Sequence, residues 1–172
     1  TADWLREYVK RGGTLVVEYP FACRDDRTWV SPKRPNNGLD DLLGCTEADR
    51  VAVNKDDERI TDVDYADTVM FPGDVRVPAA GWRVDLATTT GKTIAAWQNG
   101  APAVVRNSFG AGTVLVLGVN LSLGFANMSC DNPTGDGHAL SPQQDAFAWM
   151  AKQAGLEPLF WAHPAIWVRR RR

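Results

Sequence analysis

Cysteine and histidine are scarce in this sequence, and long hydrophobic runs are missing. The three cysteines, Cys23, Cys45 and Cys130, lie far apart without a C-x-x-C pair, and there are two histidines. This spacing excludes the common structural zinc motifs and provides no disulfide framework. No segment approaches the length of a membrane span. A signal peptide is not visible either, which leaves the location open with the cytoplasm favoured, because a fragment can lack its signal.

Basic charge is also limited outside the C-terminus. The formal net charge of −2 includes the four cations of the closing run Arg169–Arg172, so the rest of the chain carries −6. A mildly acidic body argues against nucleic acid as the main partner. Tryptophan, by contrast, is abundant, with seven residues in 172. Tryptophan anchors interfaces and sugar-binding surfaces but also fills cores, so the count alone does not decide its role.

The most regular stretch runs from Gly91 to Asn120 and reads as three strands. Thr93–Trp97 and Ala103–Asn107 are separated by an Asn-Gly pair, which supplies the positive φ angles of a tight hairpin turn. A Gly-Ala-Gly turn then leads into Thr113–Val119, which is almost entirely apolar. An unbroken apolar run of this length predicts a strand that is buried on both faces.

The chain starts with an amphipathic helix at Thr1–Arg11, on which Trp4, Leu5, Tyr8 and Val9 share a face. Two glycines end the helix, and the buried strand Thr14–Tyr19 follows at once. A helix that leads into a parallel strand normally has an earlier strand before it, because parallel strands need a crossover connection. We therefore expect N-terminal strands of this α/β unit to be missing from the sequence.

The remaining patterns predict further elements around this frame. A serine, a proline and a glutamine begin a helix that ends at Gly155. An acidic stretch, Lys55–Asp67, is interpreted as a solvated loop. The other expected elements are the short helix Gly38–Leu43, the strands Glu47–Val53, Val69–Val77 and Trp82–Thr88, and a strand at Ala165–Arg169.

Several segments together resemble one known module. They are Leu5–Tyr19 with GGTLVVEY, Gly38–Gly44 with GLDDLLG, Thr93–Gly118 with W-x-x-G-x-P-A-V-V-R-N-x-F-G-x-G-T-V-L-V-L-G, and the AGLEP end of the last helix. This order resembles the β-galactosidase trimerisation domain of glycoside hydrolase family 42 and related glycosidases. The resemblance implies a class I glutamine-amidotransferase-like fold, which is flavodoxin-like. The expected architecture is a three-layer α/β sandwich with a mainly parallel sheet and an antiparallel hairpin extension.

The resemblance also implies a division of the chain and a function. Residues 1–163 would form the amidotransferase-like domain without its N-terminal strands, and residues 164–172 the start of a β-domain or an artificial tail. The catalytic glutamates of such a glycosidase lie in a separate TIM barrel, which this chain does not resemble. The chain would then be a non-catalytic accessory domain that holds the subunits of a trimer together. Its partners would be the other domains of the same enzyme, and it would close part of a sugar-binding pocket.

Two alternative functions are an amidotransferase-like, cysteine-dependent enzyme and a stand-alone carbohydrate-binding module. An amidotransferase-like enzyme would use Cys23 or Cys130 as its nucleophile, but neither lies on a glycine-bearing strand-to-helix turn. A metal site would use His138 with Asp131 and Asp136, but their spacing matches no known motif. A hydrogen-bonded loop is the better interpretation, and neither a metal nor a cofactor is expected. The second alternative function, a stand-alone carbohydrate-binding module, depends on the exposed surface of the loops.

Two long loops are the best candidates for a functional surface. Pro20–Asn37 and Leu121–Leu140 follow the two most clearly predicted strands, and the carboxyl edge of an α/β sheet is where ligands or partners usually dock. Glu18 at a strand end lacks an identifiable second carboxylate, so glycosidase chemistry is not expected here. We predict instead that Arg24, Asp25 and Trp29 contact a sugar or a neighbouring subunit, the alternative for Trp29 being burial under its own loop.

Overall fold

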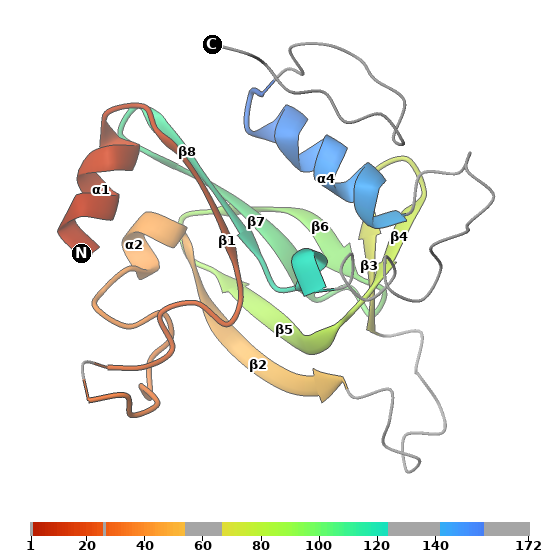
Figure 1. The fold of residues 1–172 in the computed structure, drawn as a ribbon, viewed down its shortest axis with the longest axis horizontal. Helices are drawn as coiled ribbons and strands as arrows, with labels where there is room; N and C mark the ends of the chain where they lie inside the picture. The colour runs from red at the N-terminus through yellow and green to blue at the C-terminus, as the bar shows by residue number, and fades with distance from the viewer. Residues whose placement is uncertain (1, 26, 54–66, 124–141, 157–172) are drawn as a thin grey trace, which may run out of the picture.

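A curved sheet of six strands, bent into a half-barrel, is the frame of the molecule (Figure 1). The computed structural model describes residues 2–25, 27–53, 67–123 and 142–156. In spatial order the strands are β1 (Thr14–Glu18), β8 (Gly112–Leu117), β7 (Pro102–Phe109), β6 (Lys92–Trp97), β3 (Thr68–Phe71) and β4 (Val75–Pro78). A second sheet pairs β2 (Cys45–Val53) with β5 (Gly81–Thr88), and the helices are α1 (Ala2–Lys10), α2 (Asp40–Leu43) and α4 (Pro142–Gln153).

The sheet is mixed rather than mainly parallel. Within the described residues β1 and β8 form the parallel pair, and the pairs β8–β7, β7–β6, β6–β3 and β3–β4 are antiparallel. The expectation of a mainly parallel sheet was therefore wrong. The sheet is largely antiparallel because tight turns at Gly100 and Gly110, with φ of 89° and 60°, join consecutive strands as hairpins. An α/β fold with a mixed sheet is what the structure supports.

One predicted strand is in fact a hairpin. The segment Val69–Val77 reverses between β3 and β4, with Gly73 and Asp74 both in the left-handed region at φ of 83° and 60°. The Pro-Gly-Asp sequence at the reversal is a strong turn signal, because proline cannot donate to the ladder and glycine adopts positive φ without strain. The short apolar runs on either side had suggested a continuous strand.

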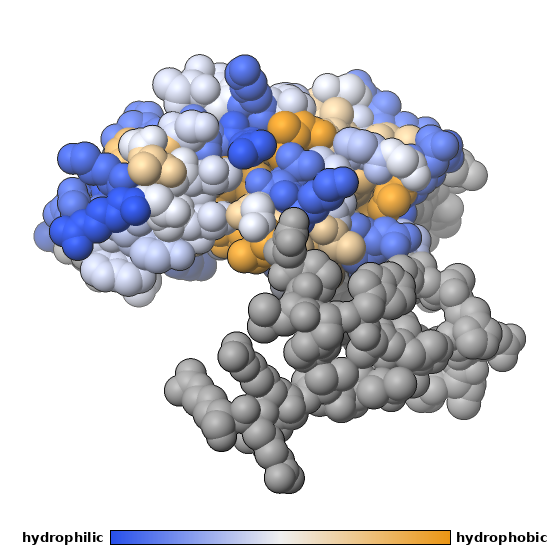
Figure 2. All heavy atoms as spheres, turned by 90° about the horizontal axis from the view of Figure 1, so that it is seen from above, coloured by the Kyte–Doolittle hydropathy of each residue, from blue (hydrophilic) through white to orange (hydrophobic). Residues whose placement is uncertain are grey.

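The strand β8 is buried on both faces and separates two cores, as its apolar sequence predicted. Leu115 and Leu117 belong to a core that α4 covers, while Val114 and Val116 point to the other face, towards α1, α2 and the β2–β5 sheet. Successive side chains of a strand point to opposite faces, so an unbroken apolar run serves both cores. Seen from above, hydrophobic residues are visible in the middle of the face, and hydrophilic residues surround them and dominate the left end of the view (Figure 2).

The helices agree with the sequence in position but not in every buried side chain. On α4, Ala146 and Met150 are buried, and the ring of Trp149 meets Phe71 edge-on with centroids 5.3 Å apart. On α1 the expected apolar face is divided: Val9 is fully buried, but the side chains of Trp4 and Tyr8 are exposed. The short helix α2 ends at Gly44 with φ of 71°, as its glycine predicted.

Some predictions fall outside the described residues. These are most of the acidic stretch 55–67, most of the loop 121–140 with Cys130, Asp131, Asp136 and His138, the serine cap at position 141, and the tail with its strand at 165–169 and its arginine run. Among the residues that the structure does describe, no helix is long and apolar enough to cross a membrane.

A candidate contact site at the loop after β1

The loop from Pro20 to Asn37 leaves the carboxyl end of β1 and folds back on itself. The backbone N–H of Ser31 donates to the carbonyl of Cys23 at 2.9 Å, and that of Asn36 donates to the carbonyl of Ala22 at 2.8 Å. Arg24 and Val30 form an isolated antiparallel bridge between these contacts. The segment is therefore an ordered, hairpin-like loop with a defined tip.

Asp25 and Arg24 organise that tip. The Asp25 carboxylate accepts hydrogen bonds from the backbone N–H groups of Arg27 and Trp29, both at 2.9 Å, which is the pattern of an Asx turn. The Arg24 guanidinium donates to the carbonyl of Thr28 at 2.6 Å. Two of the three predicted contact residues thus have partners inside their own loop, where they set its shape.

Trp29 has no such internal role. Its side chain is 74% exposed, and that of the adjacent Val30 is 58% exposed. The alternative that Trp29 is buried under its own loop was therefore wrong. The structure places Arg24, Asp25 and Trp29 together, with Trp29 as the side chain that is presented to the outside.

A buried ionic cluster lies beneath the loop and fixes it to β2. The Glu47 carboxylate is fully buried and lies 3.1 Å from the guanidinium of Arg34 on the loop, and it also pairs with Arg50. Arg50 donates to the Cys23 sulfur at 2.8 Å and stacks over the ring of Trp82, 5.6 Å from its centroid. A buried carboxylate requires such compensation, so the cluster ties the loop to the second sheet.

Two thiols, those of Cys23 and Cys45, lie near this cluster. Cys45 is fully buried, and burial raises the pKa of its thiol to about 12. A thiol that stays protonated is a poor nucleophile. Cys23 is partly buried, and two neighbours of its sulfur, the Arg50 guanidinium at 2.8 Å and the Glu47 carboxylate at 4.0 Å, belong to the ion-paired cluster. Tyr19, the last residue before the loop, is buried beside the cluster, and burial raises the pKa of its hydroxyl as well.

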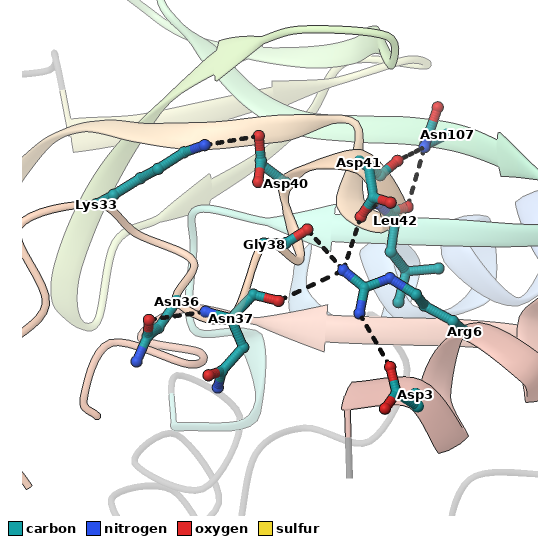
Figure 3. A network of polar contacts seen from close by, with 10 residues as sticks. All are labelled: Asp3, Arg6, Lys33, Asn36, Asn37, Gly38, Asp40, Asp41, Leu42 and Asn107. Atoms are coloured by element: carbon teal, nitrogen blue, oxygen red, sulfur yellow. Dashed lines mark hydrogen bonds and ion pairs between the residues drawn. The ribbon is translucent and has the colours of Figure 1, made fainter. Parts of the chain in front are cut away.

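The other end of the loop is clamped by Arg6 of α1 (Figure 3). Its guanidinium donates to the carbonyl of Gly38 at 2.7 Å and to the Asp41 carboxylate at 3.1 Å, and it also contacts the carbonyl of Asn37. Lys33 donates to Asp40 at 3.0 Å, and this hydrogen bond lowers the pKa of the Asp40 carboxyl. Together these contacts hold the loop, α1 and α2 in one arrangement.

Asn107 on β7 anchors α2 from the sheet side (Figure 3). Its buried amide donates to the carbonyls of Asp41 and Leu42 at 3.1 and 2.9 Å, so it satisfies groups that have no partner within such a short helix. A Cβ at Gly44 would clash with this side chain, which makes glycine necessary there for space as well as for its φ. α2 is therefore a fixed support for the loop.

Glu18, the acid at the end of β1, has a structural partner, and the described residues hold no metal-ligand cluster. Glu18 accepts a hydrogen bond from the backbone N–H of Ser122 at 3.2 Å, so it joins the end of β1 to the segment after β8. No group of three or more potential metal ligands occurs in the described part of the chain. The loop thus presents the exposed aromatic side chain of Trp29 on an ordered support.

Most side chains that support this site carry no recognisable signal in the sequence. Arg6, Glu47, Arg50 and Asn107 lie in different elements, and their partners are far away in the sequence. Glu47 alone carried a signal, because a carboxylate inside a strand that packs against a core needs a cation nearby.

Comparison with known proteins agrees with the resemblance seen in the sequence. The family model described as "Beta-galactosidase trimerisation domain" matches residues 1–128. No curated protein matches the chain in sequence. The fold is similar to that of several solved glycosidases, although at 16–20% identity this likeness concerns the fold alone.

Three of these structures show the extent of the match. Gan42B, a GH42 β-galactosidase from G. stearothermophilus, is 16% identical with a TM-score of 0.66, covering 93% of this chain and 20% of its own. A β-galactosidase from Halorubrum lacusprofundi is 20% identical with a TM-score of 0.64 (90% and 20% covered). An exo-β-1,4-mannosidase from Opitutaceae bacterium strain TAV5 is 19% identical with a TM-score of 0.57 (91% and 23%).

The chain thus spans about a fifth of the length of the first of these enzymes, with coverage of 20%. Because the family model extends over most of the sequence, from residue 1 to 128, the chain belongs to the β-galactosidase trimerisation domain family.

Proposed function

We propose that this chain is the non-catalytic subunit-contact domain of a glycoside hydrolase of the β-galactosidase type, and that it works as a trimer. The observation that carries the proposal is the family match over residues 1–128. The contact surface at the loop after β1 supports it, because Trp29 is presented outward while Arg24 and Asp25 serve the loop itself. The catalytic glutamates would then belong to another domain of the same enzyme.

Two measurements on the purified 172-residue chain test this proposal. Light scattering should give a mass three times that of the 18.9 kDa chain, and chromogenic galactosides should not be hydrolysed. Hydrolysis that a substitution within the chain abolishes would contradict the proposal. The coding sequence upstream of Thr1 gives an independent check, since the proposal expects a TIM barrel there.

A carbohydrate contact is the second candidate function, and the exposure of Trp29 favours it. An open indole beside charged side chains is the surface on which a sugar ring stacks, and in the whole enzyme it would close part of a sugar pocket. Titration with galactosides, followed by tryptophan fluorescence, tests this function. A flat response at millimolar ligand would count against it, and the Trp29→Ala variant identifies which indole responds.

We also infer that the complete domain has the amidotransferase-like, three-layer fold. The support comes from β1, which forms one edge of the described sheet and whose Val16 side chain is 45% exposed. A strand edge with unpaired backbone groups and an exposed apolar side chain is a place where another strand adds. A structure of the parent enzyme with no strand beside β1 would overturn this inference.

A further inference from the structure

A second aromatic surface, besides the tip with Trp29, lies on α1. Trp4 and Tyr8 are one helical turn apart, and their rings are stacked with centroids 5.6 Å apart and planes inclined by 11°. The exposed fractions of the two side chains are 66% and 43%. These two residues form what we call the α1 shelf.

The α1 shelf is rigid before anything binds to it. The Tyr8 hydroxyl donates to the carbonyl of Thr14 at 3.2 Å, and its ring lies so close to Gly13 that a Cβ there would clash with it. A hollow of about 550 Å³ adjoins the shelf and is lined by Trp4, Glu7, Tyr8, Arg11, Gly12 and Gly13. Preformed aromatic groups lose little conformational entropy on binding, which is why tryptophan and tyrosine dominate interface hot spots.

The two aromatic surfaces suit each other in shape. The α1 shelf is flanked by two ion pairs on the helix, in which Asp3 pairs with Arg6 and Glu7 with Arg11, both at 3.7 Å. The tip of the loop carries exposed Arg24 and Arg27 around Trp29, with Asp25 beside them. Charges of both signs therefore border each surface, and the shelf adjoins a hollow into which a projecting aromatic side chain fits.

Symmetry explains why a trimer would need both surfaces. A ring of three identical chains is built from a head-to-tail contact, in which one surface of each copy meets a different surface of the next. The α1 shelf and the tip are two such surfaces, and α1 and the loop after β1 lie on the same side of the molecule in Figure 1. Surfaces on one side allow both contacts of a copy to lie near the threefold axis.

We propose that Trp29 and Val30 of one copy insert beside the α1 shelf of the next copy, and that three such contacts close the ring. The occupant of the hollow is thus a second copy of this chain. This inference rests on the trimeric function proposed above and assigns its contact residues.

Sedimentation velocity of the full chain over a range of concentrations tests the assignment. Trp4→Ala and Trp29→Ala should each convert the trimer to monomer at a given concentration, with association weakened roughly 30-fold or more, as for a hot-spot residue. Leu156→Ala is the matched control, because Leu156 is also a large exposed side chain, at 61%, but lies beyond α4. Circular dichroism and the unfolding midpoint confirm that each variant is folded.

Mixing the two variants distinguishes a head-to-tail contact from a symmetric one. The Trp4→Ala chain keeps its loop tip and the Trp29→Ala chain keeps its shelf, so one intact contact remains between them. An immobilised Trp29→Ala chain should therefore bind the Trp4→Ala chain in solution, whereas neither variant should bind a second copy of itself. Equal binding in every combination would overturn the proposal.

The outcomes separate this inference from the function on which it rests. A wild-type trimer that persists in both tryptophan variants overturns the assignment of the surfaces and leaves the proposed function standing. A wild-type chain that is monomeric at every concentration contradicts the trimeric function and the assignment with it. A Trp29→Ala variant that stays trimeric but loses its fluorescence response to galactosides identifies the tip as a sugar contact instead.

Discussion

The backbone N–H of Val84 donates a hydrogen bond to the carbonyl oxygen of Gly118 at 2.9 Å, and this contact joins the two sheets. Gly118 directly follows β8, and Val84 lies in the middle of β5. Beside this contact the Trp97 indole donates to the carbonyl of Val84 at 3.1 Å. The second sheet, with the ionic cluster that supports the candidate site, therefore depends on a close approach of backbone to backbone.

Replacing Gly118 by alanine should destabilise the chain strongly. A Cβ at this position would clash with the carbonyl oxygen of Val84, which is backbone and cannot rotate away. We expect a loss of about 3 kcal/mol or more in the free energy of unfolding, measured with urea. Gly100→Ala is the control: its Cβ would meet nothing within 4 Å, but its φ of +89° is unfavourable for alanine. Its cost should be about 1–2 kcal/mol, and equal losses in the two variants would contradict the steric explanation.

The sequence predicted elements well where turn chemistry and periodicity agree. The helix before β1 and the strands β6, β7 and β8 lie close to their expected limits, because glycine turns bound them and apolar runs fill them. The sheet as a whole was harder to predict. A parallel sheet was expected because a helix leads directly into β1 and because of the family resemblance. In the described residues β1 and β8 do pair in parallel, but the other neighbouring strands of this sheet pair antiparallel, mostly as hairpins.

The candidate site was predictable only in part. The loop after β1 and its exposed Trp29 followed from the position of a long polar segment at the end of a strand. The roles of Arg24 and Asp25 within the loop could not be predicted, because their partners are backbone groups. Residue types alone do not specify the turn geometry that brings these groups into reach. On α1 the helical period placed Trp4 and Tyr8 in the core, but the sheet beneath covers only the side that carries Val9.

Replacing Asn107 by aspartate should cost more than its small change in shape suggests. The buried amide donates to two carbonyls of α2, and a carboxylate in its place would face these oxygens without a proton to share. Leaving buried acceptors unpaired beside a charge should reduce the free energy of unfolding by about 3 kcal/mol or more. In the matched variant Asn99→Asp the exposed side chain still accepts from the backbone N–H of Ala101. A loss below about 0.5 kcal/mol is expected there.

The buried thiol of Cys45 predicts both a labelling pattern and a pH dependence. Because burial raises its pKa from 9.0 to about 12, Cys45 should resist alkylation at pH 8 in the folded chain and react only after unfolding. Mass spectrometry of iodoacetamide-treated peptides, with and without urea, measures this. Partly buried Cys23 provides the internal comparison and should be labelled first of the two. Labelling of Cys45 at the same rate in folded and unfolded protein would contradict its burial.

The raised pKa of Cys45 also fixes the sign of the stability change at high pH. Between pH 9.0 and about 12 the Cys45 thiol keeps its proton in the folded chain, whereas the unfolded chain releases it. The folded state therefore has its full stability with respect to Cys45 below pH 9.0 and loses stability relative to the unfolded state as the pH rises towards about 12. Its slope for one group is roughly 1.4 kcal/mol per pH unit within that window. The Cys45→Ala variant should show a shallower decline than the wild type in urea titrations at increasing pH. Parallel declines would attribute the effect to other groups, of which Tyr19 is one.

Glu47 should control the order of the candidate site as well as its stability. Glu47→Gln removes the buried negative charge between Arg34 and Arg50, so both guanidinium groups lose their counter-charge. Because these arginines are partly exposed, we expect a loss of about 2–3 kcal/mol rather than the full value of a buried pair. Asp49→Asn on the same strand is the control, since Asp49 is exposed and an amide oxygen can still accept from the backbone N–H of Arg50.

Hydrogen exchange separates a local effect of Glu47→Gln from a global one. The backbone N–H groups of Ser31 and Asn36 are hydrogen-bonded within the loop, and that of Val116 lies in the buried strand β8. If Glu47 fixes the loop to β2, exchange at Ser31 and Asn36 should accelerate by more than the change in global stability accounts for, while exchange at Val116 follows global stability alone. Uniform acceleration at all three amides would mean that the ionic cluster stabilises the fold without positioning the loop.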